Sequence, residues 1–272
     1  MQLFLAIRCA GQNMNLTTSW SEANEYSLIN KTSAKAFCKI NNIRYYTVTN
    51  PVHENIIGIS TYVHEAYHNF NIGFINKGDA NAIFFMDSIQ TIRLKYNFLI
   101  TSDVILPFLD PMLVNDPDVK AYLKEDNFAK NNGIFGLMEE FSAYAHQAQF
   151  VGEVYCLLDS SVFDRSIFVE NYIRHIDYLE AKYYKFCIFI KTYYQVVSKK
   201  NNNFYSFLTN DSAFLLLEST LQSLYQNSLN KLVTVRAKLI LTLTKSIPEN
   251  EVKKYMKSKD ADLFKDILKR LN

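Results

Sequence analysis

The chain has 272 residues, of which 49% are hydrophobic and 21% are charged, enough to bury one large core or two small ones. The formal net charge is +2 at pH 7. The chain therefore lacks the strong excess of basic residues that is typical of proteins that bind nucleic acids or anionic membranes. Only 7 glycines and 5 prolines are present, which favours a helix-rich chain without long flexible linkers.

The N-terminal residues predict neither export nor membrane insertion. Met1–Ala10 is apolar but short, and it lacks the basic segment and cleavage site of a signal peptide. No apolar run reaches the length of about 18 residues that a membrane-spanning helix needs. We therefore expect a cytoplasmic protein with no membrane span, unless the chain begins downstream of an export signal.

A β-strand is predicted over Ile43–Thr49, which is rich in β-branched and aromatic residues and ends at the turn signal Asn50-Pro51. This strand leads directly into the next predicted helix. An exposed strand edge at this place would hold an extended peptide by strand addition. The alternative is a purely structural strand.

A His-Glu-x-x-His pattern, typical of zinc sites, stands at residues 64–68. On a helix, residues four apart share one face, so His64 and His68 would point at one common spot. Zinc accepts such nitrogens at roughly 2.0–2.1 Å and, in catalytic sites, keeps one position open for water. Glu65 lies about 100° round the helix, beside the ion, where it would take a proton from this water.

The apolar residues around this pattern predict the helix that carries it. They recur at intervals of three and four and form one stripe with both histidines at its edge: Ile56, Ile59, Val63, Tyr67 and Phe70. Asn50-Pro51 supplies the predicted start, and Asn71 and Gly73 the predicted end. The alternative is a chance match, with two core histidines and a solvated glutamate.

The following segment is predicted to be mostly helical over residues 80–100. Three prolines then break the chain into loops and short turns: Pro107, Pro111 and Pro117. A short helix is expected over Asp118–Lys124. Such a loop region between two halves of a site often forms the wall of a cleft.

A long helix is predicted from about Ile134 to Leu158, and it offers a third ligand. Glu139 and Glu140 both lie near its start. His146 lies two turns further on, on nearly the same face as Glu139, and is the competing ligand.

The two segments together resemble the gluzincin metallopeptidases, which include the thermolysin-like and aminopeptidase-N-like families. In these families the third zinc ligand is a glutamate on a second helix, within Leu-Asn-Glu-Gly-Phe-Ala-Ser-Tyr in the aminopeptidases. The corresponding run here is Leu137-Met138-Glu139-Glu140-Phe141-Ser142-Ala143-Tyr144. The resemblance implies Glu139 as the ligand. Glu140 is the second choice, because Ala143 would then be the small residue one turn on.

The chain also departs from these families. The segment between His68 and Glu139 is much longer, and the exopeptidase motif of the aminopeptidases is absent. The metzincin continuation is absent as well, since Asn71 stands where its glycine would be and Phe74 where its third histidine would be. The resemblance covers about a tenth of the chain.

The C-terminal part is predicted to be a helical bundle. It contains one long helix or a kinked pair over residues 167–197, a second long helical stretch over 212–245, and an amphipathic end helix over 249–271. The predicted fold class is mostly α (α+β): a zincin-like metal-binding helix pair with a small N-terminal strand, followed by this bundle. We expect a metal-binding region over residues 1–160 and a helical region packed on it over 161–272.

The predicted function is a zinc-dependent metallopeptidase that acts on a peptide or protein substrate. Zn²⁺ would be held by His64, His68 and Glu139, with Glu65 as the general base. Tyr144 and His146 are candidate donors to the oxyanion. The alternative is a non-catalytic helical binding protein with a structural or vestigial zinc site. No nucleic-acid partner is expected.

Overall fold

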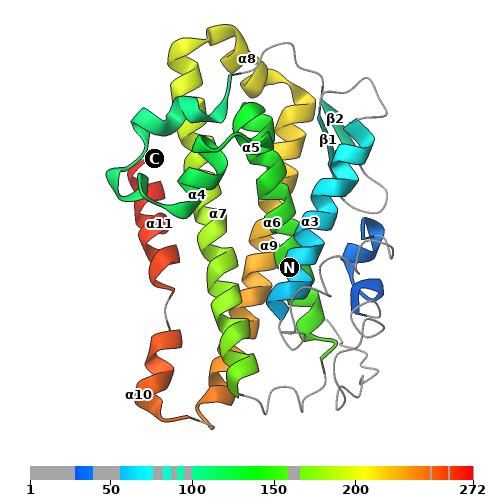
Figure 1. The fold of residues 1–272 in the computed structure, drawn as a ribbon, viewed down its shortest axis with the longest axis vertical. Coiled ribbons are helices and arrows are strands. Elements are labelled where there is room, and N and C mark those ends of the chain that lie inside the picture. The colour runs from blue at the N-terminus through cyan, green and yellow to red at the C-terminus, as the bar shows by residue number, and fades with distance from the viewer. Residues whose placement is uncertain are drawn as a thin grey trace, which may run out of the picture.

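Four long helices run alongside one another in the computed structural model (Figure 1). The structure describes residues 28–38, 56–75, 82–86, 91–94, 100–158, 166–245, 247–256 and 258–271. The long helices are α3 (Ile56–Ile75), α6 (Gly133–Tyr155), α7 (Ser166–Lys200) and α9 (Ser212–Leu243). The described part of the chain is therefore mostly helical, as predicted.

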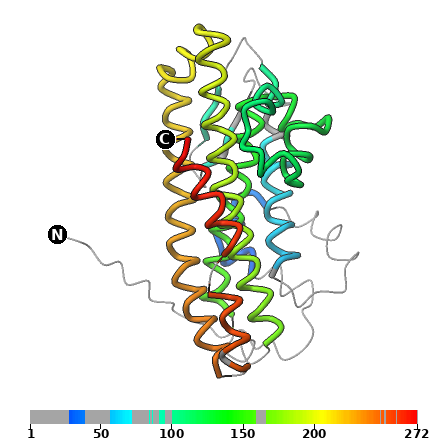
Figure 2. Tube along the Cα trace, turned by 90° about the vertical axis from the view of Figure 1, so that its left-hand side faces the viewer, coloured from blue at the N-terminus to red at the C-terminus, as the bar shows by residue number. Residues whose placement is uncertain are grey.

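Shorter elements cap and flank these four helices. The short helices are α4 (Pro117–Val119), α5 (Phe128–Asn131), α8 (Asn202–Asn210), α10 (Glu249–Val252) and α11 (Lys259–Arg270). Further helical turns lie at Ser33–Ala36, Ser102–Phe108, Pro111–Leu113, Lys120–Lys124 and Lys253–Tyr255. Figure 2 shows α11 lying along the bundle, where it packs mainly on α7.

Helix α6 is the centre of the bundle. It packs against α3, α7 and α9, and nearly all of its residues are buried. A helix that is enclosed on all sides needs small or apolar residues around its whole circumference. Its sequence supplies them, with glycine, alanine and serine interspersed among large apolar residues. Of the charged residues that α6 carries, Glu139 is buried and Glu140 and Glu153 are partly buried.

A glycine fixes where α6 begins. Gly133 has φ = 55°, in the left-handed region that favours glycine. A Cβ atom there would lie 2.0 Å from the carbonyl oxygen of Ile100 and 2.8 Å from the hydroxyl of Tyr193. That hydroxyl in turn donates a hydrogen bond to the Ile100 carbonyl at 2.5 Å. This close approach of three segments holds the first turn of α6 against α7.

The predictions for the later helices are confirmed. The patterns over residues 167–197 and 212–245 correspond to α7 and α9, and the pattern over 134–158 corresponds to α6. The short helix expected at Asp118–Lys124 is present as α4 and the following π-helical turn. The end helix is divided into α10 and α11 by the turn at Lys253–Tyr255.

The prediction of helix over residues 80–100 is wrong. This segment contains β1 (Ala82–Phe85) and β2 (Thr91–Leu94), which pair antiparallel with Phe84 opposite Ile92. The helix that carries the His-Glu-x-x-His pattern was predicted to end at Asn71 and Gly73. This end is also wrong, because α3 continues to Ile75. The strand predicted over Ile43–Thr49 lies outside the described residues, as does the predicted helix start at Asn50-Pro51.

The hydrophobic core is continuous across residue 160. Side chains of α3 and α6 belong to the same buried cluster as those of α7, α9 and α11. The division into two regions at this residue stays a prediction. Among the described helices, none combines the length and the apolar character needed to cross a membrane.

Candidate metal centre

The pairing of α3 with α6 brings the predicted metal-binding residues together. Val63 and Tyr67 are fully buried, so this stripe of α3 faces the bundle. The Tyr67 hydroxyl is hydrogen-bonded to Ser142 on α6, which ties the two helices at this level. His64 and His68 lie one position over from the stripe, one turn apart, at the border between α3 and α6.

Three donor atoms converge at this border. The Nε2 atoms of His64 and His68 lie 2.9 Å apart, and Oε2 of Glu140 lies 3.5 Å from each of them. A tetrahedral zinc ion with bonds of roughly 2.0–2.1 Å holds its ligand atoms roughly 3.3–3.4 Å apart. The triangle therefore has about the size that one zinc ion needs, and these three residues could hold a metal ion.

Glu139 occupies a different place from the one expected. Its Oε2 lies 2.5 Å from Nδ1 of His68. It therefore contacts the other ring nitrogen of His68 and not Nε2, which faces His64 and Glu140. Its Oε1 lies 3.4 Å from the side-chain amide of Asn71, which donates to it. The structure thus brings Glu140, the second choice, to the two Nε2 atoms. Glu139 takes the position of the carboxylate that orients a metal-binding histidine.

The charges in this cluster are strongly coupled. Burial acts to lower the pKa of His68, but the charge and hydrogen bond of Glu139, followed by those of Glu140, raise it to about 11. Burial acts to raise the pKa of Glu140, but hydrogen bonds and charge from His64 and His68 lower it to about 2. Without a metal ion, His68 is therefore an imidazolium between two carboxylates.

His64 has an incomplete set of hydrogen bonds. Its Nδ1 atom is buried and has no hydrogen-bond partner among the described residues. Its Nε2 atom, in contrast, faces the cluster and contacts both His68 and Glu140. The ring is thus held by its packing and by its Nε2 contacts, and a metal ion at Nε2 would add a strong one.

Glu65 follows His64 on α3 and is partly buried. One residue corresponds to about 100° of rotation, so its side chain leaves the helix beside the cluster and not into it. That is the position expected of a general base next to a metal-binding pair. Its role stays a prediction.

Tyr144 lies directly against the cluster. Its ring centroid is 4.4 Å from that of His64. Its hydroxyl lies 2.8 Å from the hydroxyl of Tyr122 and 3.0 Å from that of Tyr178. Burial, followed by these two neighbours, raises the pKa of Tyr144 well above its usual value, so the group stays a neutral hydroxyl.

A buried lysine closes this tyrosine cluster, which comprises Tyr122, Tyr144 and Tyr178. Lys182 Nζ lies 5.0–5.2 Å from the three ring centroids, within the range of cation–π attraction. The same ammonium group forms an ion pair with Asp118. This arrangement fixes α4 and α7 beside His64, His68 and Glu140, the candidate metal-binding group that is called the metal cluster from here on. The sequence pattern did not predict it.

His146 does not join the metal cluster. It is buried two turns along α6 from Glu139, about 10 Å further along the axis. Its ring packs against Phe37 at 5.4 Å and Tyr67 at 4.7 Å between centroids. The residues that could hold a metal do not include it. His146 therefore lies outside the candidate metal centre.

A second polar contact lies one turn before His64 on α3. The hydroxyl of Ser60 is 2.6 Å from Nε2 of His175, and it also accepts a hydrogen bond from Gln147 at 3.2 Å. Burial lowers the pKa of His175 to about 4, so the ring is neutral at pH 7. This contact links α3, α6 and α7 and holds α3 in place.

Asn71 is a site residue that the sequence analysis missed, because it was assigned to the helix end. Its spacing was a usable signal: it follows His68 by three residues, so both lie on one face of α3.

No family model matches the chain, and no curated protein and no solved structure matches it either. The geometry of the cluster is therefore the basis for the proposed function.

Proposed function

We propose that the protein is a zinc-dependent hydrolase of gluzincin type that cleaves peptide bonds. The observation that carries this proposal is the convergence of three donor atoms, from His64, His68 and Glu140, at the spacing of a tetrahedral ion. The pattern His-Glu-x-x-His adds Glu65, a residue that a purely structural zinc site does not need.

The proposed division of roles follows from the contacts. His64, His68 and Glu140 bind the ion, and Glu139 holds His68 in the tautomer whose Nε2 lone pair faces it. When bound, zinc supplies a Lewis acid that lowers the pKa of its water to about 7 and polarises the scissile carbonyl. Glu65 would be the general base beside the ion, accepting a proton from the attacking water and passing it to the leaving amine. Tyr144 is the candidate hydrogen-bond donor to the oxyanion.

A second candidate function is a non-catalytic helical binding protein with a structural zinc ion. The observation in its favour is burial: the side chains of His64, His68 and Glu140 are only 9%, 16% and 15% exposed. A catalytic ion must be reached by substrate, whereas a structural ion is enclosed. The two functions differ in what Glu65 does, which gives a direct test.

The test compares wild type, Glu65→Gln and Glu140→Gln. Each is purified without chelator or added metal, and metal content is measured alongside cleavage of a proteome-derived peptide library. The peptidase proposal expects about one zinc per chain in wild type and in Glu65→Gln, with cleavage only in wild type. Zinc without cleavage in wild type identifies the structural candidate. No zinc in wild type, even after zinc is offered, contradicts both.

The control is Glu125→Gln, which replaces a glutamate that is 56% exposed and pairs with exposed Lys120. It should match wild type in zinc content and cleavage. Glu140→Gln should lose zinc and cleavage together. If it keeps both, Glu140 is not a ligand.

A further inference from the structure

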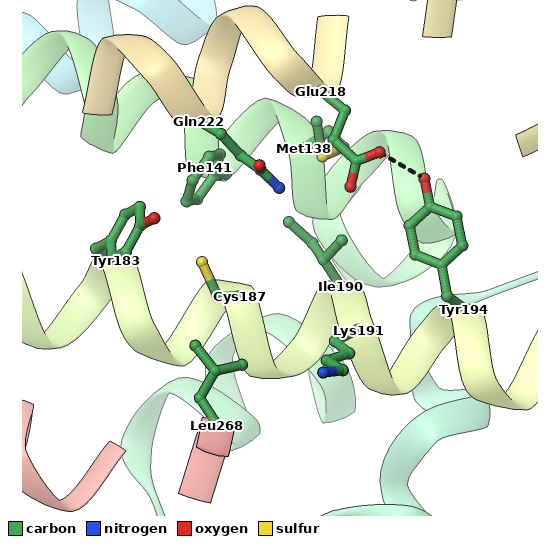
Figure 3. A pocket seen from close by; sticks show the side chains of 10 residues that line it. All are labelled: Met138, Phe141, Tyr183, Cys187, Ile190, Lys191, Tyr194, Glu218, Gln222 and Leu268. Atoms are coloured by element: carbon green, nitrogen blue, oxygen red, sulfur yellow. Dashed lines mark hydrogen bonds between the residues drawn. The ribbon is translucent and has the colours of Figure 1, made fainter. Parts of the chain in front are cut away.

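A second site lies on the opposite side of α6 from the metal cluster. It is a pocket of about 480 Å³ between α6, α7, α9 and α11 (Figure 3). Its lining residues are Met138, Phe141, Tyr183, Cys187, Ile190, Lys191, Tyr194, Glu218, Gln222 and Leu268. This volume falls in the range of pockets that hold small organic molecules.

Apolar and aromatic groups make up most of the pocket wall. Phe141 and Tyr183 pack against each other with ring centroids 5.8 Å apart. Burial raises the pKa of the Cys187 thiol to about 12, so this group is an uncharged part of the wall. The surface therefore suits a flat or apolar body more than a strongly hydrated one.

Glu218 is the acidic group of this pocket. One carboxylate oxygen lies 3.0 Å from the Tyr194 hydroxyl, which donates to it, and the other oxygen is directed towards Ile190 across the pocket (Figure 3). No ion pair of Glu218 is formed within the described part of the chain. Gln222 lies one turn further along α9 and is exposed, so the pocket opens to solvent beside the carboxylate.

We propose that this pocket binds a small organic cation, namely a protonated amine carried on an aromatic or apolar body. The amine pairs with the Glu218 oxygen that does not accept from Tyr194, and the body packs on Phe141, Tyr183 and Ile190. Aromatic rings attract cations through their faces, and a partly buried carboxylate gains most from a partner of opposite charge. Burial raises the pKa of Glu218 against the opposing Tyr194 hydrogen bond, a cost that a bound cation offsets.

The test uses three probes that share one indole ring and differ in charge. Tryptamine carries an ammonium group, tryptophol a neutral hydroxyl, and indole-3-acetate a carboxylate. Calorimetric titration of the full chain at pH 7 should give a Kd for tryptamine at least about tenfold lower than for the other two, the scale of one charge-assisted hydrogen bond. Equal affinities, a preference for indole-3-acetate through Lys191, or no saturable binding would each overturn the proposal.

Two variants locate the binding. Glu218→Gln should remove the preference for tryptamine over tryptophol. Gln222→Lys places an ammonium four residues after Glu218 on α9, where it competes with the ligand for the carboxylate, and should weaken tryptamine binding without changing tryptophol binding. Because Gln222 is exposed, this second variant tests the site without disturbing the core.

The matched control is Glu251→Gln, which replaces an exposed glutamate of α10 that does not line the pocket. It should bind tryptamine as wild type does. If it weakens tryptamine binding as much as Glu218→Gln does, the cation binds by general surface charge and the proposal fails. Zinc content should be the same in wild type and all three variants, because none of the substituted residues contacts the two histidines or the two glutamates of the candidate metal centre.

Discussion

The carboxylate of Glu139 lies 2.5 Å from Nδ1 of His68, on the side of the ring that faces away from His64. A carboxylate in this place holds the proton on Nδ1 and leaves the Nε2 lone pair for a metal ion. The two neighbouring glutamates of α6 thus have different roles in the proposed site. Glu140 faces the two Nε2 atoms that would hold the ion, and Glu139 would orient His68 as a ligand.

Glu140→Ala should weaken zinc binding more than Glu139→Ala. Loss of an orienting carboxylate typically costs roughly 10–100-fold in metal affinity, and loss of a ligand costs more. Glu139→Gln should have the smallest effect, because its amide oxygen still accepts the hydrogen bond from His68. Competition with a fluorescent zinc chelator measures all three affinities. The reverse order would restore Glu139 as the ligand.

Zinc binding should release a proton over a wide pH range. The free protein keeps His68 charged up to its pKa of about 11, and zinc requires the neutral ring. Apparent affinity should therefore rise about tenfold per pH unit from pH 6 to 8.5. Calorimetry in buffers of different ionisation enthalpy counts the protons released. An affinity that levels off above about pH 6.5, the ordinary histidine pKa, would show that His68 is not held charged.

The stability of the fold should fall as pH falls from about 6.5 to 4, through His175. The unfolded chain protonates this histidine near pH 6.5, while the buried ring stays neutral down to about pH 4. Protons are then taken up on unfolding, so stability decreases by up to about 1.4 kcal/mol per pH unit as pH is lowered. Urea unfolding of wild type and His175→Gln between pH 7 and 4.5 measures this contribution.

The difference between the two proteins is the informative quantity in this experiment. Burial raises the pKa of Asp177 to about 6, which acts in the opposite direction over part of the same range. Asp177 is present in both proteins, so its contribution cancels. Parallel stability curves for wild type and His175→Gln would mean that His175 is accessible to protons in the folded state.

Asp118→Asn should destabilise the fold by about 3 kcal/mol. The substitution leaves the buried ammonium group of Lys182 without its carboxylate, and breaking a buried pair from one side typically costs about 3–5 kcal/mol. The Lys182 side chain is 6% exposed, whereas Lys120 in the surface pair with Glu125 is 74% exposed. Glu125→Gln should therefore change stability by less than about 1 kcal/mol. Denaturant unfolding compares the two, and similar losses would contradict the argument.

Helix positions were largely predictable from the sequence, whereas one strand pair was not. The patterns of α6, α7 and α9 are long, so their period of 3.6 residues is unambiguous. The segment over residues 80–100 has too few apolar residues at this period to distinguish a helix from a strand. Apolar residues such as Phe84 and Ile92 are compatible with both. Their β-branched and aromatic side chains favour strands and were the signal for a hairpin. The helix prediction for this segment gave more weight to the spacing of the apolar residues.

The convergence of the two histidines was predictable, but which of the two glutamates joins them was not. His64 and His68 are fixed on one face of α3 by their spacing alone. Glu139 and Glu140 are adjacent, about 100° apart around α6, so the rotation of α6 about its axis decides which one faces α3. That rotation depends on contacts between distant segments, such as Gly133 with Ile100 and Tyr193. A local sequence pattern does not contain this information.

A single turn of α6 connects two sites on opposite faces of the helix. Met138 and Phe141 line the pocket, and the two residues between them, Glu139 and Glu140, contact the histidines of α3. Any occupant that shifts this turn changes the free energy of both sites. Thermodynamic reciprocity then requires that zinc alter the Kd of an amine by the same factor as the amine alters the Kd of zinc. The Kd of either ligand, zinc or the amine, would thus depend on whether the other is bound, through the four consecutive residues 138–141.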